Sequence, residues 1–539
     1  MQVSGRGGVV ASGHPAVSAA GIEILARGGN AVDAAVGAFF TSFHAEPLLG
    51  SPAGAGFLVA RVDGQPAAWD FFANAPGLGR GEAPYTPGPG AFFCTEVDFG
   101  SATQEFHVGP GSVAVPGALA GLCVAQREAG RLSLSEVLGP ARRACAEGTA
   151  TLGMGAFAVQ LLAPIVRSDP PFERYFQGPS GALLVEGEPF HNPDLGRFYD
   201  ALATAGSEAV LYDGALTGPL VAEVQGRGGG LTREDLRAYR VRREDPVQVA
   251  LGDGTRLLLC PPASSGGMLL AYGAALLDGL PAPALGSCED VLLLRAVMAE
   301  TLHARAEVLG GDTPRPAHAD RLLAPATLAA GRARVRTLLD RGPGPLPPEP
   351  SEPLGSTTHV SVIDRDGNAC AVTVSNGECS GLVLPGHGVF LNNFLGEADL
   401  NPHGFHRWPP GTRLGSSMTP LLALRPDGTV LAVGSGGSNR IRSALLQVVR
   451  NLAVHGLPAE DAVCADRLHY EDHRLYAEAA DRYAESTAAL EAEGLDLARF
   501  HGHNMFFGGA HLALRRPDGT VTGVGDPRRS GAAAVETAS

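Results

Sequence analysis

The sequence predicts a protein of the mixed α/β (α+β) class. Predicted helices, several of which begin near a proline and end at a glycine, are mixed with short apolar strands along the whole chain. A β-hairpin with period-two alternation is predicted directly after residue 356. With 539 residues and a hydrophobic fraction of 45%, the chain can bury an extensive core, and its length alone does not decide between one continuous core and three or four domains.

The first predicted elements are two helices near the N-terminus. From His14 the sequence is typical of a helix with a proline in its first turn and an end at the glycines 28 and 29. Asn30 then caps a second, alanine-rich helix. Two further helices are predicted over 116–130 and 440–455.

A proline-rich segment precedes the hairpin. Residues 342–356 contain six prolines, which can neither continue a helix nor donate to a sheet ladder, so we expect an exposed, extended connector. The hairpin over 357–376 turns at Asp366-Gly367, with valines at alternate positions on both sides. Thr357 therefore stands where the connector meets the first strand of a sheet.

Composition excludes several classes of function. All 41 basic residues are arginine, so Schiff-base catalysis, a Walker P-loop and a Ser/Lys dyad are excluded. The net charge of −15 argues against nucleic acid as a partner. No apolar run is long enough for a membrane span, and no secretory signal is visible, which predicts a soluble, cytoplasmic protein. Eight scattered cysteines indicate neither a zinc site nor a disulfide framework.

The position of Thr357 suggests a particular chemistry. If the chain is cut between Ser356 and Thr357, the threonine gains a free α-amino group, whose pKa of about 8 allows it to accept the hydroxyl proton. A tetrahedral intermediate also needs hydrogen-bond donors. The glycine-rich turn over 433–441, which leads into a predicted helix, offers backbone amides for an oxyanion hole.

Several ordered segments together resemble the gamma-glutamyltranspeptidase (gamma-glutamyltransferase, glutathione hydrolase) family of N-terminal nucleophile hydrolases. They are ASGHPAVSAAGIEILARGGNAVDAAV (11–36), VAVPGALAGL (113–122), LTREDLRAY (231–239), PPASSGG (261–267), STTHVSVIDRDGNA (356–369), LNN (391–393), SSMTP (416–420), GSGGSNRI (434–441) and GDPR (525–528). The resemblance implies a four-layer αββα sandwich. It also implies self-cleavage into a large subunit, 1–356, which ends in the connector, and a small subunit, 357–539, which stay associated around one continuous core.

The resemblance also implies roles for single residues. Thr357 matches the nucleophile of the family, and Ser375 matches a hydroxyl residue that hydrogen-bonds to it. The oxyanion hole corresponds to Gly436 and Gly437, with Gly437 and Ser438 as the alternative register. Matches to substrate-binding positions are Ser416 and Ser417 for the substrate carboxylate, and Asn376 and Glu397 near its amino group.

The chain departs from the family pattern around the glutamyl site, and so resembles a divergent member. Phe72 and Ala73 replace an Arg-Glu pair whose arginine binds the glutamyl carboxylate, and Phe394 replaces a polar residue. Another arginine, such as Arg413 or Arg440, could replace the missing charge. The connection over 401–413 looks shorter than the lid of many relatives, which suggests a more open pocket.

Three functions stay open at this point. The first is hydrolysis or transfer of gamma-glutamyl amides such as glutathione; the second is an amidase or acylase of the same fold with a different acyl donor; the third is a catalytically silent member. We expect a small-molecule amide substrate and no cofactor. The histidine pairs 403/406 and 501/503 lack a third ligand at metal-site spacing, so we expect no metal site. The oligomeric state is left open, a homodimer included.

Overall fold

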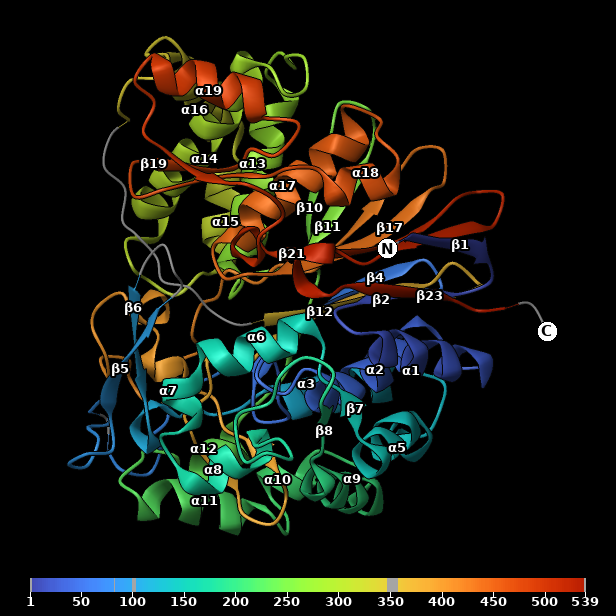
Figure 1. Ribbon diagram of the computed structural model, residues 1–539, viewed down its shortest axis with the longest axis vertical. Coiled ribbons are helices and arrows are strands. Elements are labelled where there is room, and N and C mark those ends of the chain that lie inside the picture. The colour runs from blue at the N-terminus through green and yellow to red at the C-terminus, as the bar shows by residue number, and fades with distance from the viewer. Residues whose placement is uncertain (1, 82, 99–102, 347–356, 538–539) are drawn as a thin grey trace.

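The computed structural model describes residues 2–81, 83–98, 103–346 and 357–537. Two seven-stranded antiparallel sheets lie face to face, with a layer of helices on the outer side of each (Figure 1). This is the αββα sandwich predicted from the resemblance, and the mixed α/β class is confirmed. No helix in the described part of the chain has the length and apolar character that a membrane crossing requires.

The lower sheet in Figure 1 contains the predicted hairpin at its centre. Its strands follow the order β23 (Ala532–Val535), β2 (Val9–Ser12), β12 (Thr357–Ile363), β13 (Ala369–Ser375), β3 (Ala55–Val62), β4 (Gln65–Phe71) and β9 (Arg242–Glu244). The hairpin strands β12 and β13 thus lie between β2 and β3, two strands that precede residue 357 in sequence.

The upper sheet packs against the hairpin from the other side. Its order is β1 (Gln2–Arg6), β22 (Thr520–Val524), β21 (Gly509–Arg515), β17 (Val430–Gly436), β16 (Leu421–Leu424), β11 (Arg256–Leu259) and β10 (Val247–Ala250). Smaller pairs are formed by β5 (Phe93–Asp98) with β6 (Thr103–Val108), β7 (Thr149–Ala150) with β8 (Pro189–Phe190), and β14 (Val383–Leu384) with β15 (Val389–Phe390); β18 (Leu468–Glu471), β19 (Arg474–Glu478) and β20 (Leu497–Phe500) form a separate sheet.

Helices form the two outer layers. Against the lower sheet lie α1 (Pro15–Ala26), α2 (Ala31–Ala45) and α3 (Ala118–Ala129), and against the upper sheet lie α13 (Ser265–Asp278) and α17 (Arg440–Ala453), with α14 (Cys288–Leu309) packed on α13. Other helices of seven or more residues are α5 (Gly139–Glu147), α6 (Gly153–Leu161), α9 (Pro193–Ala205), α11 (Thr217–Gly226), α15 (Pro316–Leu323), α16 (Pro325–Leu339) and α19 (Ala484–Ala492).

The predicted helix ends agree with the structure to within about two residues. His14 caps α1, and Asn30 caps α2 with a reciprocal capping box to Asp33. The helix predicted from residue 116 begins only at Ala118, because the Gly117 amide donates to the Gly54 carbonyl and a Cβ at Gly117 would lie 2.0 Å from the Phe71 carbonyl oxygen.

Strand β12 is buried on both faces, because the helices α1 and α2 cover one face and the second sheet covers the other. Val360 and Val362 belong to the core beneath α1 and α2, whereas Ile363 belongs to the core between the sheets. A side-chain period of two thus directs Thr357 toward the space between the sheets and Thr358 toward α2.

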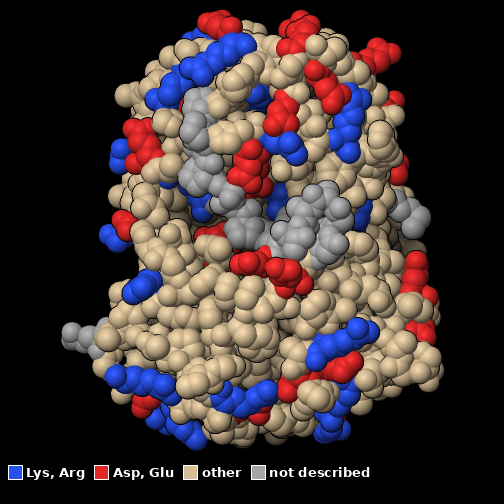
Figure 2. Space-filling model, turned by 60° about the vertical axis from the view of Figure 1, so that its left-hand side comes forward, with Lys and Arg blue, Asp and Glu red and all other residues tan. Residues whose placement is uncertain are grey.

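On the face shown in Figure 2, acidic and basic side chains are intermixed and separated by wide uncharged areas.

Candidate active site

Thr357 is the first residue of β12 and is 3% exposed. It pairs in register with Ser375, the last residue of β13, so the two hydroxyl residues stand opposite each other at one end of the hairpin. The Thr357 carbonyl accepts a hydrogen bond of 3.3 Å from Nη1 of Arg529. Ser356, the other half of the predicted cleavage site, lies outside the described residues, as does most of the predicted connector.

A small cavity of about 20 Å³ borders Thr357. It brings together the predicted residues Thr357, Ser375, Glu397, Ser416, Ser417 and Ser438, and its other lining residues are Phe72, Phe394, Asp399, Leu400, Met418 and Ile441. The described residues that line the cavity do not include three other predicted site residues, Asn376, Gly436 and Gly437. Asn376 directly follows Ser375 in sequence, and the two glycines directly precede Ser438.

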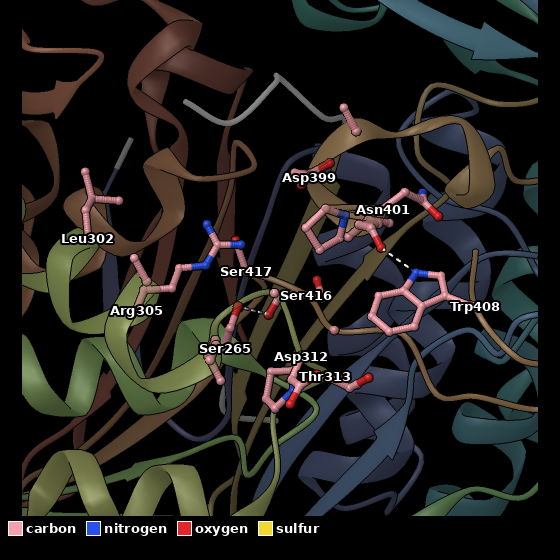
Figure 3. Close-up of a pocket in the computed structure, with 18 residues that line it drawn as sticks. Ser265, Leu302, Arg305, Asp312, Thr313, Asp399, Asn401, Trp408, Ser416 and Ser417 are labelled. Carbon is pink, nitrogen blue, oxygen red and sulfur yellow. Dashed lines mark hydrogen bonds between the residues drawn. The ribbon is translucent and has the colours of Figure 1, made fainter. Parts of the chain in front are cut away.

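A larger pocket of about 400 Å³ adjoins this cavity, and the two share Asp399, Leu400, Ser416 and Ser417. Figure 3 shows the side chain of Arg305 extending from α14 toward the serine pair, with Trp408 on the opposite wall. The cavity at Thr357 therefore continues past the serine pair into a wider pocket. We call the two together the acyl-side pocket.

The serine pair is held in place by hydrogen bonds to Ser265 and Asn439. The Ser416 carbonyl accepts from the amide and from the hydroxyl of Ser265, at 2.8 and 2.9 Å (Figure 3). Ser417 donates from its hydroxyl to Oδ1 of Asn439 at 3.0 Å. A tight start to α13 and the turn before α17 thus fix both serines at the mouth of the cavity.

The glycine-rich turn lies directly against Thr357. A Cβ at Gly436 would stand 2.2 Å from the Thr357 carbonyl oxygen, and one at Gly437 would stand 2.8 Å from Cα of Gly508, so neither position has room for a side chain. Gly437 has a φ of +125° and Ser438 a φ of +51°. Gly436 therefore packs against the backbone of Thr357, and Ser438 lines the cavity beside it.

The site predicted to bind the substrate's amino group contains acidic residues, but burial disfavours the charged form of their carboxyl groups. Burial, followed by the neighbouring Asp399 and Glu378, raises the pKa of Glu397 well above its usual range. Burial likewise raises the pKa of Asp399 to about 6, against the opposing effect of Arg305. Asn376 donates to Sγ of Cys379 at 3.1 Å, while its own Oδ1 has no hydrogen-bond partner. Burial and the neighbouring carboxylates therefore both disfavour the charged form of the Glu397 carboxyl.

The residues that replace the family's Arg-Glu pair are core residues. Phe72 is 1% exposed, stacks on Phe57 with ring centroids 5.7 Å apart, and contacts Phe394 at 5.2 Å. Phe72 and Phe394 line the cavity at Thr357, and Phe57 packs behind Phe72. The core thus extends up to Thr357.

Neither arginine considered as a replacement reaches this cavity with a free charge. Arg413 pairs with Asp70 at 3.4 Å and donates to Tyr239, to Arg240 and to the Phe72 carbonyl, so it secures the end of β4. Arg440 lies behind the glycine turn and donates to the Phe506 carbonyl at 3.1 Å. Arg305 is the arginine that lines the pocket beyond the serine pair.

Sequence reasoning missed three charged residues around Thr357: Arg305, Arg529 and Glu46. Thr358 donates from Oγ1 to the Glu46 carboxyl at 3.0 and 3.1 Å, and burial raises the pKa of Glu46 to about 7. Arg529 directly follows the GDPR segment, which was the only signal for it in the sequence. The histidine pairs do not converge: His406 donates to the Gly111 carbonyl and His503 to that of Cys464.

A buried threonine that begins a central strand in one of two stacked sheets is the arrangement of the N-terminal nucleophile hydrolases. The chain belongs to the gamma-glutamyltranspeptidase family, whose profile matches residues 17–536. It is 31% identical to the acylase ACY 1 proenzyme of Pseudomonas sp. (strain V22), over 98% of this chain and 93% of that protein. It is 30% identical to a glutathione hydrolase proenzyme of Pseudomonas aeruginosa, over 98% and 94%.

A solved structure supports the fold. The crystal structure of a cephalosporin acylase from Bacillus halodurans superposes with a TM-score of 0.81 over 99% of this chain and 96% of that one, at 23% identity. At this identity the likeness concerns the fold alone. Acylases and glutathione hydrolases are thus both among the relatives, and the acyl donor has to be argued from the site.

Proposed function

We propose that the protein is a self-processing amide hydrolase that forms an acyl-enzyme on Thr357 and prefers acyl donors without the glutamyl α-ammonium group. The observation that carries this proposal is the wall of the cavity at Thr357. Phe72 stands at the position of the family's arginine and contacts Phe394, which stands at that of a polar residue, and burial disfavours the charged form of Glu397. The α-carboxylate of a glutamyl group would lose its ion pair with that arginine. Its α-ammonium group could form an ion pair with Glu397 only if this buried carboxyl became ionised.

The reaction proceeds in two halves. The Thr357 α-amino group, freed by cleavage, accepts the Oγ proton while Oγ attacks the amide carbonyl, and backbone N–H groups of the turn 436–438 stabilise the oxyanion. The C–N bond breaks, and the amine leaves with the proton from the α-ammonium group. The Thr357 α-amino group then deprotonates a water molecule, which hydrolyses the ester and releases the acid.

Self-cleavage uses the same oxygen. In the precursor, Oγ of Thr357 attacks the carbonyl of the preceding residue, the peptide becomes an ester, and water hydrolyses that ester. We expect denaturing electrophoresis to show two fragments, with N-terminal sequencing of the smaller one beginning at Thr357. Thr357→Ala should remain one chain with no amidase activity, and a single uncut wild-type chain after long incubation would refute self-processing.

Acyl preference is tested with three anilides that share one leaving group. A glutaryl anilide differs from the γ-glutamyl anilide only by lacking the α-ammonium group, and a pentanoyl anilide also lacks the carboxylate. We expect kcat/KM to be higher for the glutaryl than for the γ-glutamyl substrate by about tenfold or more, the equivalent of one charged hydrogen bond. A preference for the γ-glutamyl anilide would refute this part of the proposal.

Gamma-glutamyl transfer is the second candidate, and it has its own support. Ser416 and Ser417 of the family's carboxylate site are present at the mouth of the cavity, and Arg305 lines the same pocket. These groups suit a carboxylate at the far end of the acyl chain. The same set of anilides separates this candidate from the first.

A further inference from the structure

A second pocket shares no described lining residue with the acyl-side pocket and is lined by Arg529, which contacts Thr357. Its volume is about 470 Å³, and Arg440, Arg529, Phe157, Phe500 and Phe506 are among its lining residues. Arg529 connects it to the nucleophile, because Nη1 donates to the Thr357 carbonyl while Nη2 donates to the Met505 carbonyl at the pocket wall. The pocket therefore begins within one residue of the reacting atoms.

Two buried guanidinium groups in this pocket have unused donors. Arg440 is 3% exposed and Arg529 is 5% exposed, yet Nη1 of Arg440 and Nε of Arg529 have no hydrogen-bond partner. The neighbouring Arg528 is different, because it donates to both Glu478 and Asp526. An unbonded N–H on a buried cation is costly, so the two unused donors indicate that an anionic group completes the site.

The charges around the two arginines do not cancel within the pocket. Burial lowers the pKa of Arg440 and of Arg529 to about 10, so both remain charged near neutral pH. Glu378 lines the same pocket and opposes these shifts, as does the nearby Glu471 for Arg440. Arg442 faces Glu471 as well. Among the described residues that line the pocket, Glu378 is the only carboxylate; Asp399 near Arg440, and Asp526 and Glu46 near Arg529, lie outside its lining.

The rest of the wall is aromatic. Phe500 and Phe506 stack with ring centroids 5.2 Å apart, and the Arg440 guanidinium lies 5.0 Å from the Phe506 centroid. Phe157 on α6 is 46% exposed at the rim. Such a surface favours a flat apolar body, because aromatic rings contribute both contact area and stacking.

The position of the pocket decides which half of the substrate it receives. The acyl-side pocket contains the serine pair that matches the family's acyl-donor site, and the second pocket approaches Thr357 from the side of its carbonyl and Arg529. The second pocket is therefore our candidate for the amine half of an amide whose acyl chain occupies the first.

We propose that the second pocket binds the amine half of the substrate, namely an amine with a flat apolar body that carries a carboxylate, and that Arg440 and Arg529 bind this carboxylate. This inference rests on the proposed function, because it assigns the leaving amine of the same reaction. A ligand that bridges both arginines would use the two donors that the protein leaves unbonded.

Two amides with the same acyl group test this assignment. One releases 4-aminobenzoate and the other releases the neutral 4-aminobenzamide, which has nearly the same shape. For the wild-type enzyme we expect kcat/KM to favour the aminobenzoate amide by at least tenfold. Arg440→Gln should bring this ratio close to one. Equal kcat/KM for both amides in the wild type would overturn the proposal.

Phe157→Asp supplies a second variant that does not disturb a buried residue. A carboxylate at the rim should lower the preference for the aminobenzoate amide about threefold or more. Phe93→Asp is the matched control, since Phe93 is 39% exposed on β5 and does not line the pocket. If Arg440→Gln fails to fold, an unchanged ratio in Phe157→Asp would count against the proposal.

Direct binding separates this inference from the proposed function. Calorimetric titration of the wild-type protein with 4-aminobenzoate and with 4-aminobenzamide needs no turnover. We expect the carboxylate probe to bind at least tenfold more tightly, and its advantage to disappear in Arg440→Gln. A protein that cleaves no amide but shows this difference would refute the proposed function and retain the anion site, whereas equal binding of both probes would overturn the site itself.

Discussion

Glu46 links the nucleophile strand to α2 and makes stability depend on pH. Burial raises its pKa from 4.5 to about 7. Because the folded-state pKa lies above the unfolded one, the folded protein holds more protons between about pH 4.5 and 7, and this group lowers stability as pH rises through that window. At pH 8 the cost is about 3 kcal/mol, at 1.36 kcal/mol per pKa unit.

We therefore expect Glu46→Gln to unfold at higher denaturant concentration than wild type at pH 8 and at the same concentration near pH 4.5. Glutamine retains an oxygen that can accept a hydrogen bond from the Thr358 hydroxyl. The measurement is a series of chemical denaturation curves between these two pH values, with the exposed Glu493→Gln as control. A wild-type curve no steeper in pH than that of Glu46→Gln would contradict the assignment.

Phe394 is expected to limit the size of the acyl group. Truncating a buried phenylalanine typically costs about 3 to 5 kcal/mol, and it also opens space beside Thr357. We expect Phe394→Ala to raise kcat/KM for a bulky acyl anilide over that for a small one by about tenfold. Phe176→Ala is the control, since Phe176 is equally buried in a separate cluster and should lower stability without changing this ratio.

At the residue scale, the role of a side chain could be predicted from the sequence only where its residue type and its position in a recognisable motif indicate that role. Thr357, Ser416 and Ser417 were predicted in this way, and the structure brings them to one cavity. The substitution at Phe72 was visible in the sequence, but its stacking on Phe57 was not. Glu46 and Arg529 escaped notice because burial, which sets their pKa values, depends on packing from distant segments.

The turn after β22 shows how one element is held by charge. Asp526 is fully buried and pairs with Arg467 at 2.6 Å and with Arg528 at 3.2 Å. These arginines lower its pKa, so the stabilisation is present above the unfolded pKa of Asp and is lost only in strong acid. The turn carries Arg529, so its position sets the contact with the Thr357 carbonyl.

Asp526→Asn should lower the free energy of unfolding by about 3 to 5 kcal/mol, because it leaves Arg467 buried without its partner. Denaturant titration at pH 7 measures this change. Arg474→Met removes one side of an ion pair in which Arg474 and Asp496 are each at least half exposed, and it should change stability by less than about 1 kcal/mol. Similar losses in both variants would show that the buried pair contributes little.

At the scale of elements, prediction was best where local signals sufficed. The helix start near Pro15, the cap at Asn30 and the hairpin turn at Asp366-Gly367 depend on neighbouring residues only, and all were placed correctly. The start of α3 was placed two residues early, because the contact between Gly117 and the backbone of Gly54 is tertiary. Strand order in the sheets could come only from the family resemblance.

At the scale of the whole molecule, the two predicted fragments are interleaved. Strand β12 pairs with β2, and β13 pairs with β3, so two strands after residue 357 lie between two strands before it. The last strand, β23, pairs with β2 as well. Separation of the fragments would break ladder hydrogen bonds on both sides of the hairpin and expose the cores on both faces of β12.

We therefore expect cleavage at Thr357 to leave the molecule intact. The cleaved protein should elute from a sizing column at the volume of the uncut Thr357→Ala chain, and should unfold in one transition that is the same by tryptophan fluorescence and by circular dichroism. Its fragments should separate only in denaturant. Release of the smaller fragment in native buffer, or two resolved transitions, would show that the sheets do not form one continuous core.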